Sequence, residues 1–170
     1  MDNELLAEQV ITLRAPTALD GAHVHRLVSR CPPLDPNSVY CNLLQCSHFA
    51  STSVAAVLDG ELVGFVSGYV IPEKPHVLFV WQVAVGEAAR GRGLATKMVS
   101  SILARDTLKS VTHIETTITE DNQASWNLFR GLAKAHSAEL SSEVFFSKEE
   151  HFLGEHDSEH LVSIGPLART

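Results

Sequence analysis

A glycine-rich turn at the start of an expected helix is the feature that most constrains this sequence. The turn at 90–95 reads Arg-Gly-Arg-Gly-Leu-Ala and directly follows the apolar run 77–85. A strand that enters a helix through such a turn leaves unpaired backbone N–H groups at the helix N-terminus, where the helix dipole adds partial positive charge. Gly91 and Gly93 can adopt the positive φ angles that the turn needs, and they let a ligand approach the backbone. The sequence therefore predicts a phosphate or pyrophosphate site here.

Length and composition favour a globular protein with a buried core. The chain has 170 residues, 45% of them hydrophobic and 19% charged, so we expect one domain spanning 1–170, with 1–9 flexible. The formal net charge of −7 argues against a nucleic-acid partner and suits a cationic ligand. No apolar run approaches the roughly 18 residues of a membrane span, and the acidic N-terminus does not resemble a signal peptide. Three cysteines, Cys31, Cys41 and Cys46, fit reduced thiols in a cytoplasmic protein.

The order of the expected elements predicts an α/β fold with a mixed central sheet flanked by helices. Asp59-Gly60 between two Val-rich runs is a strong hairpin signal, and Ser38 is placed to cap a helix after a proline-rich turn. Strands are expected at 10–14, 52–58, 61–71, 77–85, 113–119, 140–147 and 161–165, and helices at about 20–31, 39–46, 94–108 and 123–136.

The turn at 90–95 lacks the spacing of a P-loop and of a dinucleotide-binding loop. It matches the pattern Arg/Gln-x-x-Gly-x-Gly/Ala, and it resembles the coenzyme A pyrophosphate loop of the GNAT N-acetyltransferases. Taken alone, the hexapeptide is better explained as an ordinary strand-to-helix turn with two solvated arginines. The expected order of strands and helices is also that of the GNAT fold, with the turn in the position of the coenzyme loop. The resemblance therefore implies a GNAT acetyltransferase fold.

Four further segments, at 31–40, 79–85, 116–125 and 158–166, resemble the L-2,4-diaminobutyrate acetyltransferases of ectoine biosynthesis, a family within the GNAT superfamily. The Pro-Pro-Leu-Asp stretch of the first segment and the tryptophan strand of the second are much more specific than the coenzyme loop. The tail departs from the family pattern, because 156–159 reads His-Asp-Ser-Glu here.

This resemblance implies that the chain transfers the acetyl group of acetyl-CoA to the γ-amino group of L-2,4-diaminobutyrate and forms a homodimer. It places the backbone of Val83 and Val85 against the pantetheine amides, and the turn at 90–95 around the pyrophosphate. Asn122 is also a candidate helix cap, with Asp121 as its rival. The implied coenzyme-binding residues are Val83, Val85, Arg90, Gly91, Arg92, Gly93, Leu94, Ala95, Asn122 and Ser125.

Residue chemistry supports the same substrate, because a molecule with two ammonium groups and one carboxylate needs acidic groups in its pocket. Asp35 follows two prolines in a loop suited to binding, although an Asx turn would also explain it. Trp81 is expected to share a strand face with Phe79 and Val83, where it would either pack in the core or wall the amine pocket. The acidic stretch near the C-terminus would be a solvated loop or part of this pocket. The expected substrate-binding residues are Asp35, Trp81, Thr117, Glu155 and Glu159.

The sequence leaves the catalytic groups open. The substrate amine must lose a proton before it attacks the thioester, and Glu159 or His156 could accept it through water. Many GNAT enzymes use a tyrosine of the fourth helix as the acid, but Phe129 stands there. His151, His156 and His160 follow no zinc-site pattern, so no metal is expected. Two alternatives remain: a GNAT enzyme acting on polyamines or protein N-termini, and a non-catalytic acyl-CoA-binding module.

Overall fold

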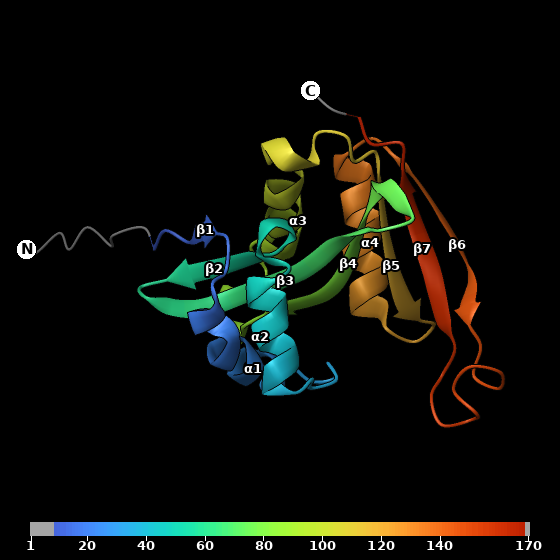
Figure 1. The fold of residues 1–170 in the computed structure, drawn as a ribbon, viewed down its shortest axis with the longest axis horizontal. Helices are drawn as coiled ribbons and strands as arrows, with labels where there is room; N and C mark the ends of the chain where they lie inside the picture. The colour runs from blue at the N-terminus through green and yellow to red at the C-terminus, as the bar shows by residue number, and fades with distance from the viewer. Residues whose placement is uncertain (1–8, 169–170) are drawn as a thin grey trace, which may run out of the picture.

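A mixed sheet with helices on both faces forms the described part of the protein, residues 9–168 of a computed structural model (Figure 1). The seven strands lie in the order β1-β2-β3-β4-β5-β7-β6. All neighbours are antiparallel except β4 and β5, which run parallel. The strands are β1 (Thr12–Arg14), β2 (Val54–Leu58), β3 (Glu61–Ile71), β4 (Lys74–Val85), β5 (His113–Thr119), β6 (Glu139–Phe146) and β7 (Glu159–Gly165). The expected α/β fold is therefore confirmed.

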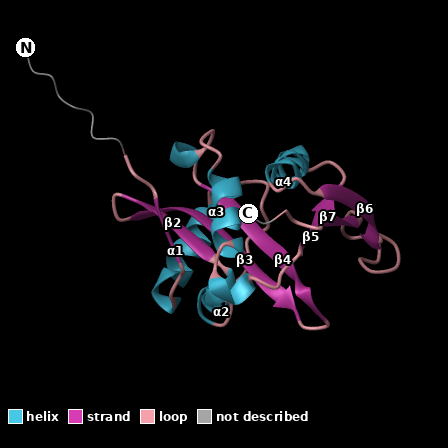
Figure 2. Cartoon of the chain, turned by 90° about the horizontal axis from the view of Figure 1, so that it is seen from above, coloured by secondary structure: helices cyan, strands magenta, loops and turns pink. Residues whose placement is uncertain are grey.

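The helices form two layers, with α1 and α2 on one face of the sheet and α3 and α4 on the other (Figure 2). Ile102 and Leu132 are completely buried together with Ile164 on the α3–α4 face, and Val24 of α1 packs with Phe65 on the opposite face. Removing these apolar side chains from water is the main force that holds the layers together. The helices are α1 (Gly21–Ser29), α2 (Val39–Ser47), α3 (Leu94–Leu103) and α4 (Gln123–Ala135).

A β-bulge interrupts β4 at Trp81. Two adjacent residues of β3 pair with Val80 and Gln82, so Trp81 is the extra residue. Val80 packs in the cluster under α3 and α4, and so does Val83, three positions further on. The expectation that Phe79, Trp81 and Val83 share one face is therefore wrong for Val83, because the extra residue reverses the alternation of the strand. The bulge turns Gln82 toward the α1–α2 side, next to Trp81.

Most element bounds agree with the sequence within a few residues, and those of β3 and β5 agree completely. The Asp59-Gly60 turn has φ angles of 50° and 80°, as a hairpin of this kind requires. Helix α3 ends at Leu103, earlier than expected, because Arg105 is extended and its guanidinium donates to two carbonyl oxygens of the 50–51 turn, at 3.2 and 2.8 Å. Of the segment 1–9 that is expected to be flexible, residues 1–8 lie outside the described part.

Candidate active site

The parallel strands β4 and β5 pair only at Val77–Phe79 and His113–Glu115 and then separate. At the point of separation, the Thr116 hydroxyl donates to the Val80 carbonyl at 2.9 Å. Beyond this bond β4 pairs with β3 alone, so the backbone of Val83 has no strand partner on its β5 side within the described chain. This gap leaves main-chain groups available to an extended ligand, as in the addition of a strand.

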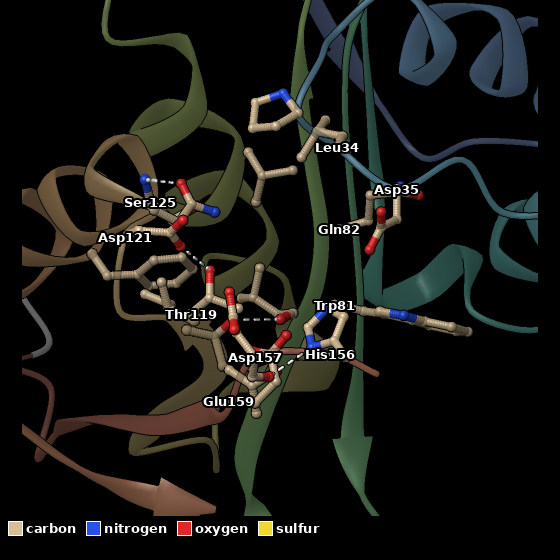
Figure 3. A pocket seen from close by; sticks show the side chains of 18 of the residues that line it. Leu34, Asp35, Trp81, Gln82, Thr119, Asp121, Ser125, His156, Asp157 and Glu159 are labelled. Carbon is tan, nitrogen blue, oxygen red and sulfur yellow. Dashed lines mark hydrogen bonds between the residues drawn. The ribbon is translucent and has the colours of Figure 1, made fainter. Parts of the chain in front are cut away.

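A cavity of about 680 Å³ opens where β4 and β5 separate (Figure 3). Its walls come from six segments: the turn between α1 and α2, the bulged part of β4, the end of β5, the first part of α4, the loop 147–158 between β6 and β7, and the first residue of β7. All five expected substrate-binding residues line it, although they are spread over more than a hundred positions. They are Asp35, Trp81, Thr117, Glu155 and Glu159.

The cavity is acidic. Among its described lining residues, Lys148 carries the one Lys or Arg charge, and its Nζ is already bound to the Asp157 carboxylate at 3.2 Å. The carboxylates that line it are Asp35, Asp121, Glu155, Asp157 and Glu159. Such a wall attracts a cationic substrate and disfavours an anionic one.

Glu159, the first residue of β7, has the most perturbed carboxylate of this wall. Burial raises its pKa, and the nearby charge of Asp35 adds to the rise. His156 and a hydrogen bond with the Thr117 side chain act in the opposite direction, but the net shift of the Glu159 pKa is upward. Its Oε2 is buried without a hydrogen-bond partner among the described residues. A carboxylate with a raised pKa and a free oxygen in a cavity is suited to accept a proton.

His156 lies beside Glu159 in the cavity wall (Figure 3). Its Nδ1 faces the Asp157 carbonyl at 2.6 Å, so Nδ1 carries the proton and donates this bond. The ring also packs on Phe152, with ring centroids 4.6 Å apart. The imidazole is therefore held in place by the 147–158 loop, and Glu155 of the same loop is exposed at the cavity rim.

Trp81 forms part of the cavity wall and is 43% exposed, so it is not a core residue. Its ring makes edge contacts with Phe49 and Tyr69, each at 6.2 Å between centroids. Phe79 packs on Tyr69 at 5.3 Å. These contacts hold the indole in place, and an aromatic ring beside acidic groups can bind an ammonium group.

Asp35 lies in the turn between α1 and α2, across the cavity from Glu159 (Figure 3). Its carboxylate makes no hydrogen bond with another described residue, so an Asx turn does not account for it. The charge of Asp35 raises the pKa of Glu159, so the two carboxylates are close enough to interact electrostatically across the cavity. Two ammonium groups of one small molecule can each face one of these walls.

The glycine turn has the geometry that the sequence predicts. Gly91 and Gly93 have φ angles of 74° and 67°, and Gly93 is the N-cap of α3. No heavy atom lies within 4 Å of the position where a Cβ of either glycine would stand, so the approach to the backbone is open. The Arg90 Nε donates to the Val85 carbonyl at 3.1 Å, and Leu94 is buried. The turn lies outside the lining of the main cavity.

Asn122 caps α4, with its Oδ1 accepting a hydrogen bond from the Ser125 backbone N–H at 3.2 Å. Asp121, the rival cap, instead accepts from the Thr119 hydroxyl at 3.0 Å. Asn122 and Ser125 also line the cavity, so capping and a place beside the ligand are compatible. Phe129 lines the cavity too, and no tyrosine is among its described lining residues.

Several residues of the cavity wall are not evident from the sequence. Gln82 is not evident because strict alternation would place its side chain on the face of the sheet opposite to that of Trp81. A bulge, which changes this, leaves no clear pattern in a Val-rich strand. Lys148 is missed because nothing in its sequence context shows which way the loop folds. The missed residues include Asn37, Gln82, Thr119, Lys148 and Asp157.

Comparison with known proteins places these features in a family. Residues 22–133 match the model of the acetyltransferase (GNAT) family. The L-2,4-diaminobutyric acid acetyltransferase of Methylotuvimicrobium alcaliphilum is 61% identical over 93% of this chain and 92% of its own length. That of Halomonas elongata is 52% identical over 91% of this chain and 81% of its own length. In the described chain, no helix is long and apolar enough to cross a membrane, and no three His, Cys, Asp or Glu side chains cluster as metal ligands.

Solved structures agree with this grouping. The diaminobutyrate acetyltransferase EctA of Paenibacillus lautus, in complex with its substrate L-2,4-diaminobutyric acid and coenzyme A, superposes with a TM-score of 0.88. It is 36% identical, and the match covers 95% of this chain and 98% of that one. The ribosomal-protein-S18-alanine N-acetyltransferase of Escherichia coli, at 12% identity and a TM-score of 0.68, shares the fold alone, with 95% and 96% of the two chains covered. The chain belongs to the acetyltransferase (GNAT) family and, within it, to the L-2,4-diaminobutyric acid acetyltransferases.

Proposed function

We propose that this protein transfers the acetyl group of acetyl-CoA to the γ-amino group of L-2,4-diaminobutyrate, a step of ectoine biosynthesis and thus of osmoprotection. The observation that carries the proposal is the placement of Asp35 and Glu159 on opposite walls of one acidic cavity at the gap between β4 and β5. A substrate with two ammonium groups matches two facing carboxylates. The diaminobutyrate acetyltransferases named above support the same substrate.

Acetyl-CoA would enter from the gap between the strands. The unpaired edge of β4 at Val83 and Val85 would bind the pantetheine amides, and the backbone N–H groups of the turn at 90–95 would bind the pyrophosphate. Asn122 and Ser125, at the start of α4, would border the pantetheine. The thioester would then lie at the inner end of the gap, within reach of an amine held in the acidic cavity.

The reaction needs a neutral amine, and Glu159 is our candidate for the base that produces it. Its carboxylate would take a proton from the γ-ammonium group, directly or through a water molecule that His156 helps to hold. The amine nitrogen then attacks the thioester carbonyl carbon and a C–N bond forms. The nitrogen loses its second proton to solvent, and the C–S bond breaks to leave the amide and release the coenzyme as a thiolate. With Phe129 in the place of the usual tyrosine, the thiolate would take its proton from solvent.

The release of coenzyme A with different amines tests the proposal. Diaminobutyrate should release it much faster than spermidine or a lysine-containing peptide. Equal rates would favour a GNAT enzyme for polyamines or protein N-termini. Binding of acetyl-CoA without turnover of any amine would leave only a non-catalytic binding module.

We also infer that residues 1–170 form one domain, which works in the cytoplasm and assembles as a homodimer. The three cysteines are free, as expected where thiols stay reduced. Edge strand β6 exposes Val144, Phe145 and Phe146, an apolar group that a second copy could cover. Sedimentation equilibrium would give twice the chain mass for a homodimer and the single mass for a monomer.

A further inference from the structure

Gln82 occupies an unusual place for a polar side chain in the middle of a sheet. The bulge at Trp81 turns it from the α3–α4 core to the α1–α2 side, where it lines the cavity. Figure 3 shows it on the same wall as Asp35, away from Glu159. No role in the reaction described above uses this residue.

The Gln82 side chain is buried but not satisfied. The residue is only 8% exposed, and its Oε1 is fully buried without a hydrogen-bond partner among the described residues. Leaving a buried acceptor unpaired is unfavourable, so such a group in a cavity wall points to a ligand that supplies the missing donor. The chemistry of that donor follows from the neighbours: Asp35 on the same wall and the other carboxylates of the cavity favour a cationic N–H donor.

We propose that Gln82 is a specificity-determining residue, whose Oε1 accepts a hydrogen bond from the α-ammonium group of the substrate while Asp35 neutralises the charge of that group. This inference rests on the proposed function. If Glu159 acts on the γ-amine at the opposite wall, the α-ammonium group is the one that reaches Gln82 and Asp35. An ammonium group has three N–H donors, so it can bind a carboxylate and an amide oxygen together.

Gln82 would therefore distinguish substrates that carry an amino group at the α position. 4-Aminobutyrate has the same chain length and the same γ-amine but no α-ammonium group. It would leave both Asp35 and the Gln82 Oε1 unpaired, and a site built to bind a polar group discriminates strongly against the analogue that lacks it.

The test compares the wild-type enzyme with Gln82→Met, which preserves size but removes the acceptor. We expect the KM for diaminobutyrate to rise about tenfold or more, with the KM for acetyl-CoA unchanged. The kcat/KM for 4-aminobutyrate should change little, so the preference for diaminobutyrate over 4-aminobutyrate shrinks by the same factor. Ser67→Ala is the matched control, because Ser67 pairs with Gln82 across β3 and β4 and its Oγ is also buried and unpartnered, yet it does not line the cavity.

An equal loss of activity on both amines, or an unchanged KM for diaminobutyrate, would overturn the inference. If Gln82→Met does not fold, Gln82→Asn withdraws the amide by one methylene and should weaken the same preference. A wild-type enzyme that does not use diaminobutyrate would refute the proposed function. A wild-type enzyme and a Gln82→Met variant that prefer diaminobutyrate over 4-aminobutyrate to the same degree would refute only the role of Gln82.

Discussion

At the scale of single residues, the proposed reaction uses two carboxylates in different environments. Burial and the charge of Asp35 raise the pKa of Glu159, whereas Asp35 itself is exposed in a loop. A group that must lose its proton before it acts gives an activity that falls as the pH drops through its pKa. We therefore assign the role of base to Glu159 and that of an anchoring charge to Asp35.

Glu159→Gln should lower kcat by roughly 100-fold or more, because the amide cannot accept the proton of the substrate amine. The acid limb of the pH profile of kcat/KM should also disappear, since the titrating group is gone. Steady-state rates between pH 5 and pH 9 would show both effects. Glu149→Gln, an exposed change outside the main cavity, is the control. An acid limb that survives in Glu159→Gln would exclude Glu159 as the base.

Asp35→Asn removes the anchoring charge without changing the size of the side chain. We expect kcat/KM for diaminobutyrate to fall by a factor that corresponds to a loss of roughly 1.5–3 kcal/mol of transition-state stabilisation, with acetyl-CoA binding unchanged. The acid limb should also move to lower pH, because Asp35 no longer raises the pKa of Glu159. Calorimetry that shows both ligands weakened alike would make Asp35 a structural residue of the turn.

At the scale of elements, the turn before α3 can be tested apart from the amine cavity. Gly93→Val places a β-branched side chain at a φ of 67°, which only glycine adopts readily, in the space left open for phosphate. The KM for acetyl-CoA should rise at least about tenfold. Circular dichroism should show the fold retained, and the KM for diaminobutyrate should stay near that of the wild type. Unchanged affinity for acetyl-CoA would remove this turn from the coenzyme site.

The carboxylate of Asp20 links β1 to the start of the α1–α2 layer. Two hydrogen bonds from Arg14, both 2.8 Å, and one from the Thr17 N–H lower the pKa of the buried Asp20. A lowered pKa means that this stability is present at neutral pH and is lost as the pH falls through the folded-state pKa. Asp20→Asn should reduce the unfolding free energy by roughly 1.5–3 kcal/mol at pH 7, as measured by denaturant titration.

The difference in stability between Asp20→Asn and the wild type should begin to narrow as the pH drops below about 4, the pKa of an aspartate in an unfolded chain. It should vanish once the pH falls below the lowered pKa of Asp20 in the folded protein. Asp106→Asn, which breaks an exposed pair with Lys109, should change the stability little at any pH. A loss for Asp20→Asn that is independent of pH would show that packing, and not the ion pair, is responsible.

At the scale of the whole molecule, the sequence predicts the fold better than the inside of the site. The order of strands and helices along the chain, the caps at Ser38 and Asn122, and the glycine turn before α3 follow from local patterns, because capping and positive φ angles depend on nearby residues. The face of the sheet to which each β4 residue after Trp81 points could not be predicted, since a bulge depends on the pairing with a neighbouring strand. Gln82 was missed for this reason, and Lys148 because the path of its loop is set by tertiary contacts.

The position of the acetyl group on the product shows whether the cavity holds the substrate by its α-end. In solution the α-amine is the less basic of the two amines, so near pH 7 it is neutral more often and free chemistry does not favour the γ-amine. Acetylation of the γ-amine therefore requires an enzyme that holds the α-end of the substrate and presents the γ-nitrogen to the thioester. Proton NMR of the product, with diaminobutyrate, ornithine and 1,3-diaminopropane in competition, measures this choice. We expect γ-acetylation, with ornithine and 1,3-diaminopropane used much more slowly because ornithine is too long and 1,3-diaminopropane lacks the carboxylate. Predominant α-acetylation, or ornithine used as well as diaminobutyrate, would contradict this expectation.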